Sequence, residues 1–261
     1  MRRAVVLVIL LLALANPAWA ENSGERLLGD ERYAIVLDSH FIWHGPQAAR
    51  GVIVWGHGLD GRRADLRKGP TQPYLHALNG AGYDILRFER DPEWDGNGRL
   101  DSIVAFLRDS LIELRHRGWK TVIAAGQSRG GINSLLLLKS PGVVDAILAV
   151  SPALAGTDPG EVNTRGEVQF YTMLSDVPPQ PTRVMFAQFE GDPFVGNEDK
   201  RVRRLHEMLE PQIGPMLIID RPAGLTGHHG GNSEQFAARF SDCIAHFVMD
   251  PTPPQSCPDG K

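Results

Sequence analysis

Residues 121–138 read TVIAAGQSRGGINSLLLL, and this stretch decides the fold. A β-like apolar run ends at Gly126, and a helix-like run covers 132–138. Between them, residues 126–130 fit the pattern G-x-S-x-G. A serine on a very tight strand-to-helix turn needs strained backbone angles, and flanking glycines let the neighbouring chain pass without a clash. We therefore expect Ser128 to project from the end of a strand, with the amino end of a helix directed at its hydroxyl.

The rest of the chain alternates between strand-like and helix-like segments. Short apolar runs predict strands over 33–37, 52–55, 84–88, 121–125, 146–150, 183–189 and 216–219. Helical spacing relates Leu100, Ile103, Val104, Leu107, Leu111 and Leu114, with Gly118 just past the end. It also relates Phe236, Phe240, Ile244 and Phe247, with Ser233 as the expected N-cap. This alternation predicts an α/β fold with a mostly parallel central sheet and helices on both faces, and with its chemistry at the carboxyl ends of the strands.

The amino terminus has the pattern of a cleavable secretory signal peptide. Arg2 and Arg3 precede an apolar run over 4–14, and small residues stand at Ala18 and Ala20. The run is shorter than the roughly 20 residues that span a membrane. We therefore expect a signal peptide over 1–20, a single domain over 21–261, no membrane anchor, and a location in the periplasm or outside the cell. The oligomeric state stays open.

Charge and cysteine content limit the partners. Without Arg2 and Arg3, the chain has about 25 basic residues against 31 acidic ones, which argues against a nucleic acid or an anionic membrane. Its two cysteines, Cys243 and Cys257, predict a disulfide in an exported protein, joining the last helix to the Pro-rich tail. Two cysteines without a Cys-x-x-Cys spacing do not predict a structural zinc site.

In this context, residues 126–130 resemble the nucleophile turn of the α/β-hydrolase superfamily, and the resemblance extends over residues 21–261. That family places an acid after the nucleophile and a histidine last. The resemblance implies Asp192, in EGDPFV after the strand over 183–189, as the acid, with Asp199 in reserve. It implies His228 in GHHGG as the base, because the family usually has glycine before its histidine. His229 is the alternative.

The resemblance also implies an oxyanion hole. WGHGL, residues 55–59, resembles the family's His-Gly oxyanion segment, so we expect the N–H of Leu59 as one donor, with Gly58 less suited. The N–H of Arg129, directly after the nucleophile, is the other. Some esterases of the family that act on sugar-acid esters carry an arginine there. The Arg129 side chain could therefore help the oxyanion, or it could form a surface salt bridge.

A Ser-Asp-His site transfers an acyl group to water through an acyl-enzyme and needs no metal or organic cofactor. Hydrolysis of small-molecule carboxylic esters is the expected reaction, and amide or peptide hydrolysis is the alternative. Specificity is expected in a small lid over 152–181 with one short helix over 167–174, which favours short or polar acyl groups. Trp94 is a candidate for a second wall of the pocket.

Two other classes of function are compatible with parts of the sequence. Residues 56–61 read GHGLDG, a G-x-G-x-x-G after a strand, as in dinucleotide-binding proteins. That fingerprint needs an apolar helix starting inside it, whereas residues 62–70 are charged and interrupted. A binding module of the same fold without chemistry stays open, because fold does not imply function. The pair His228 and His229 could also be part of a metal site, but the sequence offers no convincing further ligands.

Overall fold

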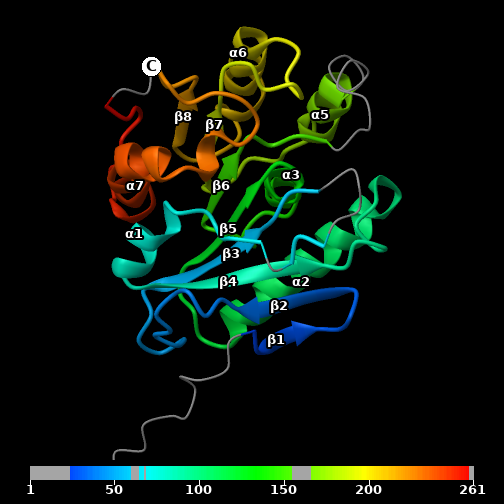
Figure 1. The fold of residues 1–261 in the computed structure, drawn as a ribbon, viewed down its shortest axis with the longest axis vertical. Helices are drawn as coiled ribbons and strands as arrows, with labels where there is room; N and C mark the ends of the chain where they lie inside the picture. Colours follow the sequence, from blue (N-terminus) through cyan, green and yellow to red (C-terminus); the bar gives the residue numbers. More distant parts are fainter. Residues whose placement is uncertain (1–23, 60–64, 68, 155–165, 259–261) are drawn as a thin grey trace, which may run out of the picture.

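The computed structural model describes residues 24–59, 65–67, 69–154 and 166–258. The predicted signal peptide over 1–20 lies outside these residues. In the described part, eight strands form one sheet in the order β1-β2-β4-β3-β5-β6-β7-β8 (Figure 1). β1 and β2 pair antiparallel, as do β2 and β4, and all later pairs are parallel. The prediction of a mostly parallel sheet is confirmed.

The strands are β1 (Arg26–Gly29), β2 (Tyr33–Leu37), β3 (Gly51–Gly56), β4 (Tyr83–Arg90), β5 (Val122–Gln127), β6 (Ala146–Val150), β7 (Arg183–Gln188) and β8 (Met216–Asp220). Seven of them lie where the apolar runs predict strands, with ends that differ by at most two residues. β1 was not predicted, because it is a four-residue edge strand whose residues are exposed or half-buried. Such a strand carries no run of buried apolar residues for the sequence to reveal.

The α-helices of the described part are α1 (Leu75–Gly80), α2 (Leu100–His116), α3 (Arg129–Leu136), α5 (Glu167–Leu174), α6 (Glu198–Leu209) and α7 (Glu234–Met249). The predicted helix over 167–174 coincides with α5. Ser233 caps α7 as expected, because its hydroxyl accepts a hydrogen bond from the Phe236 N–H at 3.1 Å. Gly118 follows α2 with φ of 116°, a conformation that glycine adopts without strain.

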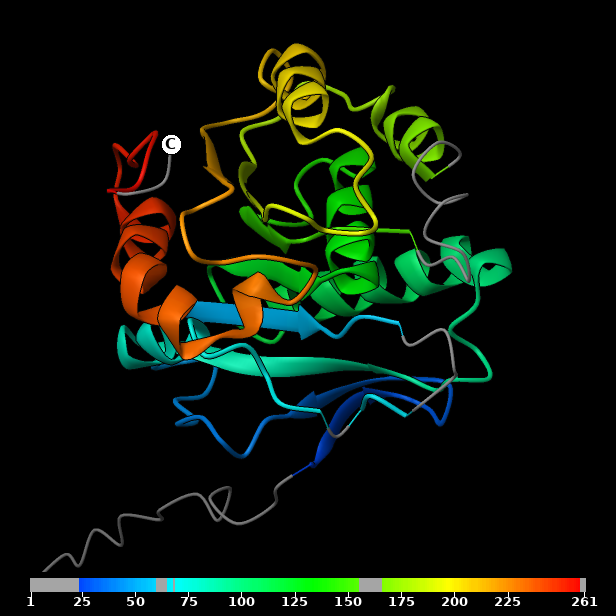
Figure 2. The same cartoon turned by 45° about the horizontal axis from the view of Figure 1, so that its top comes forward.

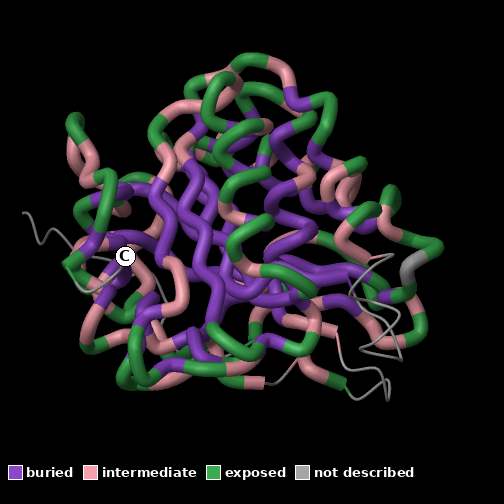
Figure 3. The backbone as a smooth tube through the Cα atoms, turned by 90° about the horizontal axis from the view of Figure 1, so that it is seen from above, coloured by how far each residue is buried: buried purple, intermediate pink, exposed green. Residues whose placement is uncertain are grey.

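Helices cover both faces of the sheet. On one face, Val54 and Val122 pack with Leu107 of α2 and Ile132 of α3. On the other, their neighbours Ile53 and Ile123 pack with α1 and with the phenylalanines of α7. Figures 1 and 2 show α7 and α3 on opposite sides of the strands, and Figure 3 shows the buried strands in the centre of the molecule. Burial on both faces explains why these strands read as continuous apolar runs.

The predicted disulfide is present between Cys243 of α7 and Cys257 of the tail, 14 residues apart in sequence. It joins the last helix to the Pro-rich segment that follows. No helix among the described residues has both the length and the apolar character needed to cross a membrane.

We predict that breaking this disulfide lowers the free energy of unfolding by about 3 kcal/mol, because a closed loop of this size restricts the unfolded chain. Urea denaturation with and without dithiothreitol measures the difference. The double variant Cys243→Ala/Cys257→Ala should match the reduced wild type and should not respond to dithiothreitol. A wild type that is equally stable in both conditions would contradict the prediction.

Candidate active site

Ser128 occupies a strained turn between β5 and α3. Its φ and ψ are 53° and −119°, a region that non-glycine residues rarely adopt. The residue is buried, and its amide donates to the Val150 carbonyl oxygen at 3.0 Å. Strain of this kind persists where the surrounding structure enforces it, and such places are often functional sites. The turn is the one that the sequence predicts.

The two glycines of the motif are required by close packing. A Cβ at Gly126 would lie 2.3 Å from the carbonyl carbon of Gly130. A Cβ at Gly130 would lie 2.0 Å from the carbonyl oxygen of Gly56, at the end of β3. Both neighbours are backbone atoms, which cannot turn aside as a side chain could. The start of α3 therefore approaches the ends of β5 and β3 at distances that no side chain permits.

Asp192 and His228 lie together, on the loops that follow β7 and β8. The His228 Nδ1 is 2.9 Å and 3.0 Å from the two carboxylate oxygens of Asp192, and both residues are buried. The Phe194 N–H also donates to Asp192, at 2.9 Å. Because a carboxylate accepts, the imidazole donates through Nδ1, which leaves Nε2 as the basic nitrogen. The first-choice acid and the first-choice histidine thus form a buried pair.

Backbone and side-chain contacts hold these loops beside the serine turn. A parallel bridge joins Glu190 to Thr226, and the Gly227 N–H donates to the Glu190 carbonyl at 2.8 Å. The Gln127 Nε2 donates to the carbonyl oxygen of His228 at 3.2 Å. Because Gln127 directly precedes Ser128, this bond fixes the histidine loop against the turn that carries the serine. The structure therefore brings the loops of Ser128, Asp192 and His228 to one edge of the sheet.

The reserve residues have different environments. Asp199, at the start of α6, has a side chain that is 73% exposed and pairs with Arg221 at 2.5 Å. His229 is exposed, and its Nδ1 lies 3.3 Å from the amide nitrogen of Asn232. Its pKa is lowered, first by the burial of part of its ring and then by the neighbouring His228. Neither reserve residue takes part in the buried acid–histidine pair.

The expected oxyanion segment lies directly against Ser128. A Cβ at Gly58 would lie 3.2 Å from the Ser128 Cβ and 3.7 Å from its Oγ. Leu59 follows Gly58 and is half-buried. Arg129 is the first residue of α3, where the helix dipole concentrates positive charge. Both amides expected to bind the oxyanion therefore belong to segments in contact with the serine turn.

The Arg129 side chain is not at the surface, as a surface salt bridge would require. The residue is 0% exposed, and its Nη2 donates to the Gly96 carbonyl at 3.1 Å. Burial lowers the pKa of Arg129 to about 10, and the charge of Asp95 opposes this shift. The side chain therefore binds the loop after β4 in the protein interior.

His57 is buried next to the serine turn and is neutral. Burial lowers its pKa well below 6.5, and the charge of Arg90 adds to the shift. Its Nδ1 lies 2.6 Å from the Gly58 carbonyl oxygen, so the Nδ1–H donates to this acceptor. His57 thus stabilises the turn of the segment over 55–59.

Sequence reasoning missed Gln127 and Phe194, which contact the acid–histidine pair. Gln127 donates to His228, and the ring of Phe194 lies 4.5 Å from the imidazole of His228. The only indication of their roles in the sequence is that Gln127 precedes Ser128 and that Phe194 lies two residues after Asp192. Trp94, the candidate pocket wall, packs against the core, with the Arg99 guanidinium 3.9 Å from the centre of its ring.

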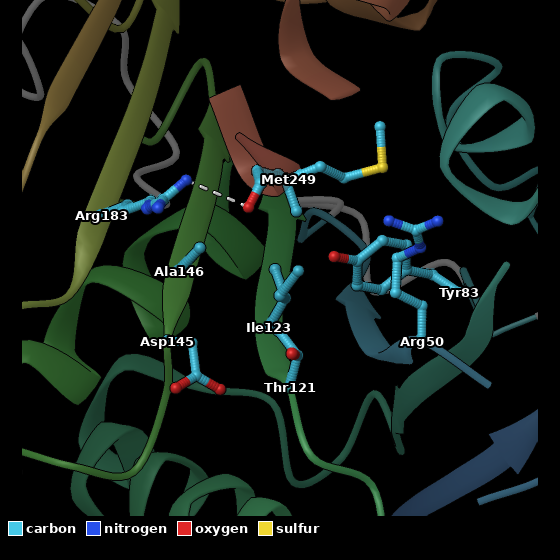
Figure 4. A pocket seen from close by; sticks show the side chains of 9 residues that line it. Arg50, Tyr83, Thr121, Ile123, Asp145, Ala146, Arg183 and Met249 are labelled. Atoms are coloured by element: carbon cyan, nitrogen blue, oxygen red, sulfur yellow. Dashed lines mark hydrogen bonds between the residues drawn. The ribbon is translucent and has the colours of Figure 1, made fainter. Parts of the chain in front are cut away.

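A polar cavity of about 330 Å³ lies at the other end of the sheet (Figure 4). Its lining includes Arg50, Tyr83, Thr121 and Asp145, at the amino ends of parallel strands. Arg183 lines it too and donates to the carbonyls of Phe247 and Val248, at the end of α7. It contains none of the candidate site residues. Among the described residues, no cluster of three or more histidine, cysteine or acidic side chains could hold a metal ion.

Comparison with known proteins finds similarity in structure and not in sequence. No family model matches the chain, and no curated protein matches it. Est1E from Butyrivibrio proteoclasticus is 12% identical with a TM-score of 0.57, over 88% of this chain and 98% of that one. The esterase Pf2001 of Pyrococcus furiosus is 12% identical with a TM-score of 0.55, over 85% and 88%. A dienelactone hydrolase from Anabaena variabilis is 16% identical with a TM-score of 0.54, over 87% and 95%.

We predict that Gly130→Ala lowers the free energy of unfolding by about 3 kcal/mol, because the new methyl group meets the backbone of Gly56. Gly80→Ala is the matched control, since a Cβ at Gly80 meets nothing within 4 Å. The control should change stability by about 1 kcal/mol or less. Urea denaturation measures the free energy of unfolding of both variants. Equal values for the two would contradict the close packing of Gly130 against Gly56.

We predict that His57 contributes to acid destabilisation. The unfolded chain protonates this histidine near its ordinary pKa of 6.5, whereas burial keeps the folded ring neutral. The unfolded state therefore binds more protons, and the free energy of unfolding should decrease as pH falls below about 6.5. The contribution is at most about 1.4 kcal/mol per pH unit.

His57→Asn keeps a donor for the Gly58 carbonyl and removes the proton uptake. Its free energy of unfolding should fall less steeply between about pH 6.5 and pH 5 than that of the wild type. The exposed His116→Asn is the control and should leave the slope unchanged. Identical slopes for His57→Asn and the wild type would contradict the prediction.

Proposed function

This chain has the α/β-hydrolase fold, and we propose that it is an exported serine hydrolase that cleaves small-molecule carboxylic esters with Ser128, Asp192 and His228. The observation that carries the proposal is the strained Ser128 turn on the same sheet edge as the buried Asp192–His228 pair. A non-catalytic module has no physical need for both features. The proposed chemistry uses groups of this chain and requires no cofactor.

The roles follow from the hydrogen bonds. Ser128 Oγ attacks the ester carbonyl, and the Nε2 of His228 takes its proton, because Nδ1 is occupied by Asp192. Asp192 keeps the imidazole in this tautomer and stabilises it when it is charged. The protonated imidazole then gives its proton to the leaving alcohol. Water, activated by the same nitrogen, hydrolyses the acyl-enzyme and releases the acid.

Negative charge develops on the carbonyl oxygen when the tetrahedral intermediate forms. The amides of Leu59 and Arg129 are the proposed donors to this oxygen, supported by the contact of Gly58 with Ser128 and by the place of Arg129 at the head of α3. Fixed backbone donors of this kind need little reorganisation during the reaction. The Arg129 side chain, which binds Gly96, supports the turn from inside the protein.

The substrate class is proposed from the neighbours in structure and from the lid. The similar structures include an esterase and a dienelactone hydrolase, and both names denote enzymes that cleave ester bonds. Within the segment over 152–181, α5 is a single helix of eight residues, and residues 155–165 lie outside the described part. A small lid favours short or polar acyl groups over long lipid chains. We also propose that Trp94 forms a second wall of the acyl pocket.

Export is proposed from the sequence at the amino terminus. Removal of residues 1–20 would leave a single domain over 21–261, in the periplasm or outside the cell. The disulfide between Cys243 and Cys257 supports this location, because disulfides persist in oxidising compartments.

The test is hydrolysis of p-nitrophenyl acetate by residues 21–261 of the wild type and of Ser128→Ala. The variant should lose at least about 10⁴-fold in kcat, because the nucleophile is removed while the fold remains. Ser39→Ala, at an exposed turn, is the matched control and should keep wild-type activity. His228→Ala should lose a similar factor, whereas His229→Ala should change kcat by less than about tenfold.

Other outcomes identify the alternatives. Activity on p-nitroanilides and peptides that exceeds activity on esters, and that Ser128→Ala abolishes, would replace the ester hydrolase with an amidase on the same site. A folded wild type without activity on a panel of esters and amides would overturn catalysis and favour the binding module. Loss of activity in His229→Ala but not in His228→Ala would exchange their roles.

A further inference from the structure

Arg90, the last residue of β4, is a fully buried cation beside the candidate active site. The residue is 0% exposed, although its strand ends at the carboxyl edge of the sheet. A buried guanidinium is costly unless its N–H groups meet acceptors. The acceptors of Arg90 therefore indicate what this cation does.

Arg90 has one anionic partner and two backbone partners. Its Nε donates to the Asp95 carboxylate at 2.9 Å, and the Asp95 side chain is 1% exposed. Its Nη2 donates to the carbonyl oxygens of His57 at 2.6 Å and of Gly58 at 3.1 Å. Asp95 thus orients the guanidinium through Nε, and Nη2 donates to two successive carbonyls of the oxyanion segment.

The Gly58 carbonyl and the Leu59 N–H belong to the same peptide unit. This unit is planar and trans, so its C=O and N–H point in opposite directions. Whatever fixes the carbonyl on one side also fixes the direction of the N–H on the other. Arg90 and the Nδ1–H of His57 both donate to the Gly58 oxygen, which fixes this peptide from the carbonyl side.

The peptide unit also transmits charge. A donor on the carbonyl oxygen polarises the amide and makes its N–H a stronger donor, and a charged donor does so most. The Gly58 Cα faces the serine, since a Cβ there would lie 3.7 Å from Ser128 Oγ. A series of hydrogen bonds therefore connects Asp95, Arg90 and the Gly58–Leu59 peptide, which contacts the turn of Ser128.

We propose that Arg90 is a positioning residue that fixes and polarises the Gly58–Leu59 peptide, so that the Leu59 N–H is set to receive the oxyanion, with Asp95 holding the guanidinium in place. This inference rests on the proposed ester hydrolysis. The strength of the oxyanion hole then depends on a buried cation on the carbonyl side of this peptide.

The test measures kcat and KM for p-nitrophenyl acetate in the double variant Arg90→Met/Asp95→Asn, which removes both charges of the buried ion pair together. The kcat should fall about 10²-fold to 10³-fold, as on loss of an oxyanion donor, while KM changes by less than about threefold. Arg90→Lys keeps the charge without the planar fork and should fall between the double variant and the wild type. The affinity for a phenylboronic acid, whose Ser128 adduct is tetrahedral, should fall with kcat.

Arg183→Met is the matched control. Arg183 also donates to two successive backbone carbonyls, but at the amino end of the sheet, by the cavity of Figure 4. This variant can lower the free energy of unfolding, and its kcat should stay within about threefold of the wild type. A loss of kcat that equals that of the Arg90 variants would show general destabilisation and would overturn the inference.

The remaining outcomes are also decisive. An active wild type together with an unchanged kcat in Arg90→Lys and in the double variant overturns the role of Arg90 and leaves the ester hydrolase standing. If the double variant does not fold, Arg90→Lys decides, and an unchanged kcat and boronate affinity overturn the inference. A wild type without esterase activity overturns the proposed function and this inference with it.

Discussion

The candidate site depends on the close approach of Gly130 to Gly56. The first turn of α3 lies so near the end of β3 that a Cβ at Gly130 would be 2.0 Å from the Gly56 carbonyl oxygen. This approach accompanies the sharp turn at Ser128, where φ is positive, and brings the segment over 57–59 beside the serine. One backbone contact thus sets the direction of the proposed nucleophile and the place of the proposed oxyanion donors.

The other half of the site follows from sheet order. β7 and β8 are adjacent and parallel, so the loops that leave their carboxyl ends lie side by side and carry Asp192 and His228 into contact. β5 lies two strands from β7, and Gln127 spans part of that gap by its bond to the His228 carbonyl. The site is therefore assembled from residues far apart in sequence because parallel strands end at one edge.

Much of this arrangement was predictable from the sequence, for physical reasons that differ by element. Strands buried on both faces appear as apolar runs, and the turn at Ser128 appears because close backbone packing demands glycine. The edge strand β1 and the six-residue helix α1 were not predicted, since neither has a long periodic pattern. Arg90 was missed because a charged residue at the end of a strand resembles a surface residue until its burial is known.

The C-terminal half of α7 is bound to the rest of the protein in two ways. The disulfide at Cys243 ties the helix to the tail, and Arg183 of β7 binds the carbonyls of Phe247 and Val248. At its other end, the helix begins at Ser233, directly after the loop of His228, whose Gly230 carbonyl accepts a bond from the Ser233 hydroxyl at 3.0 Å. The 16 residues of α7 thus lie between the loop of His228 and the Pro-rich tail. Because Cys243 and Ser233 belong to one helix, the disulfide and the loop of the proposed base share a single structural element.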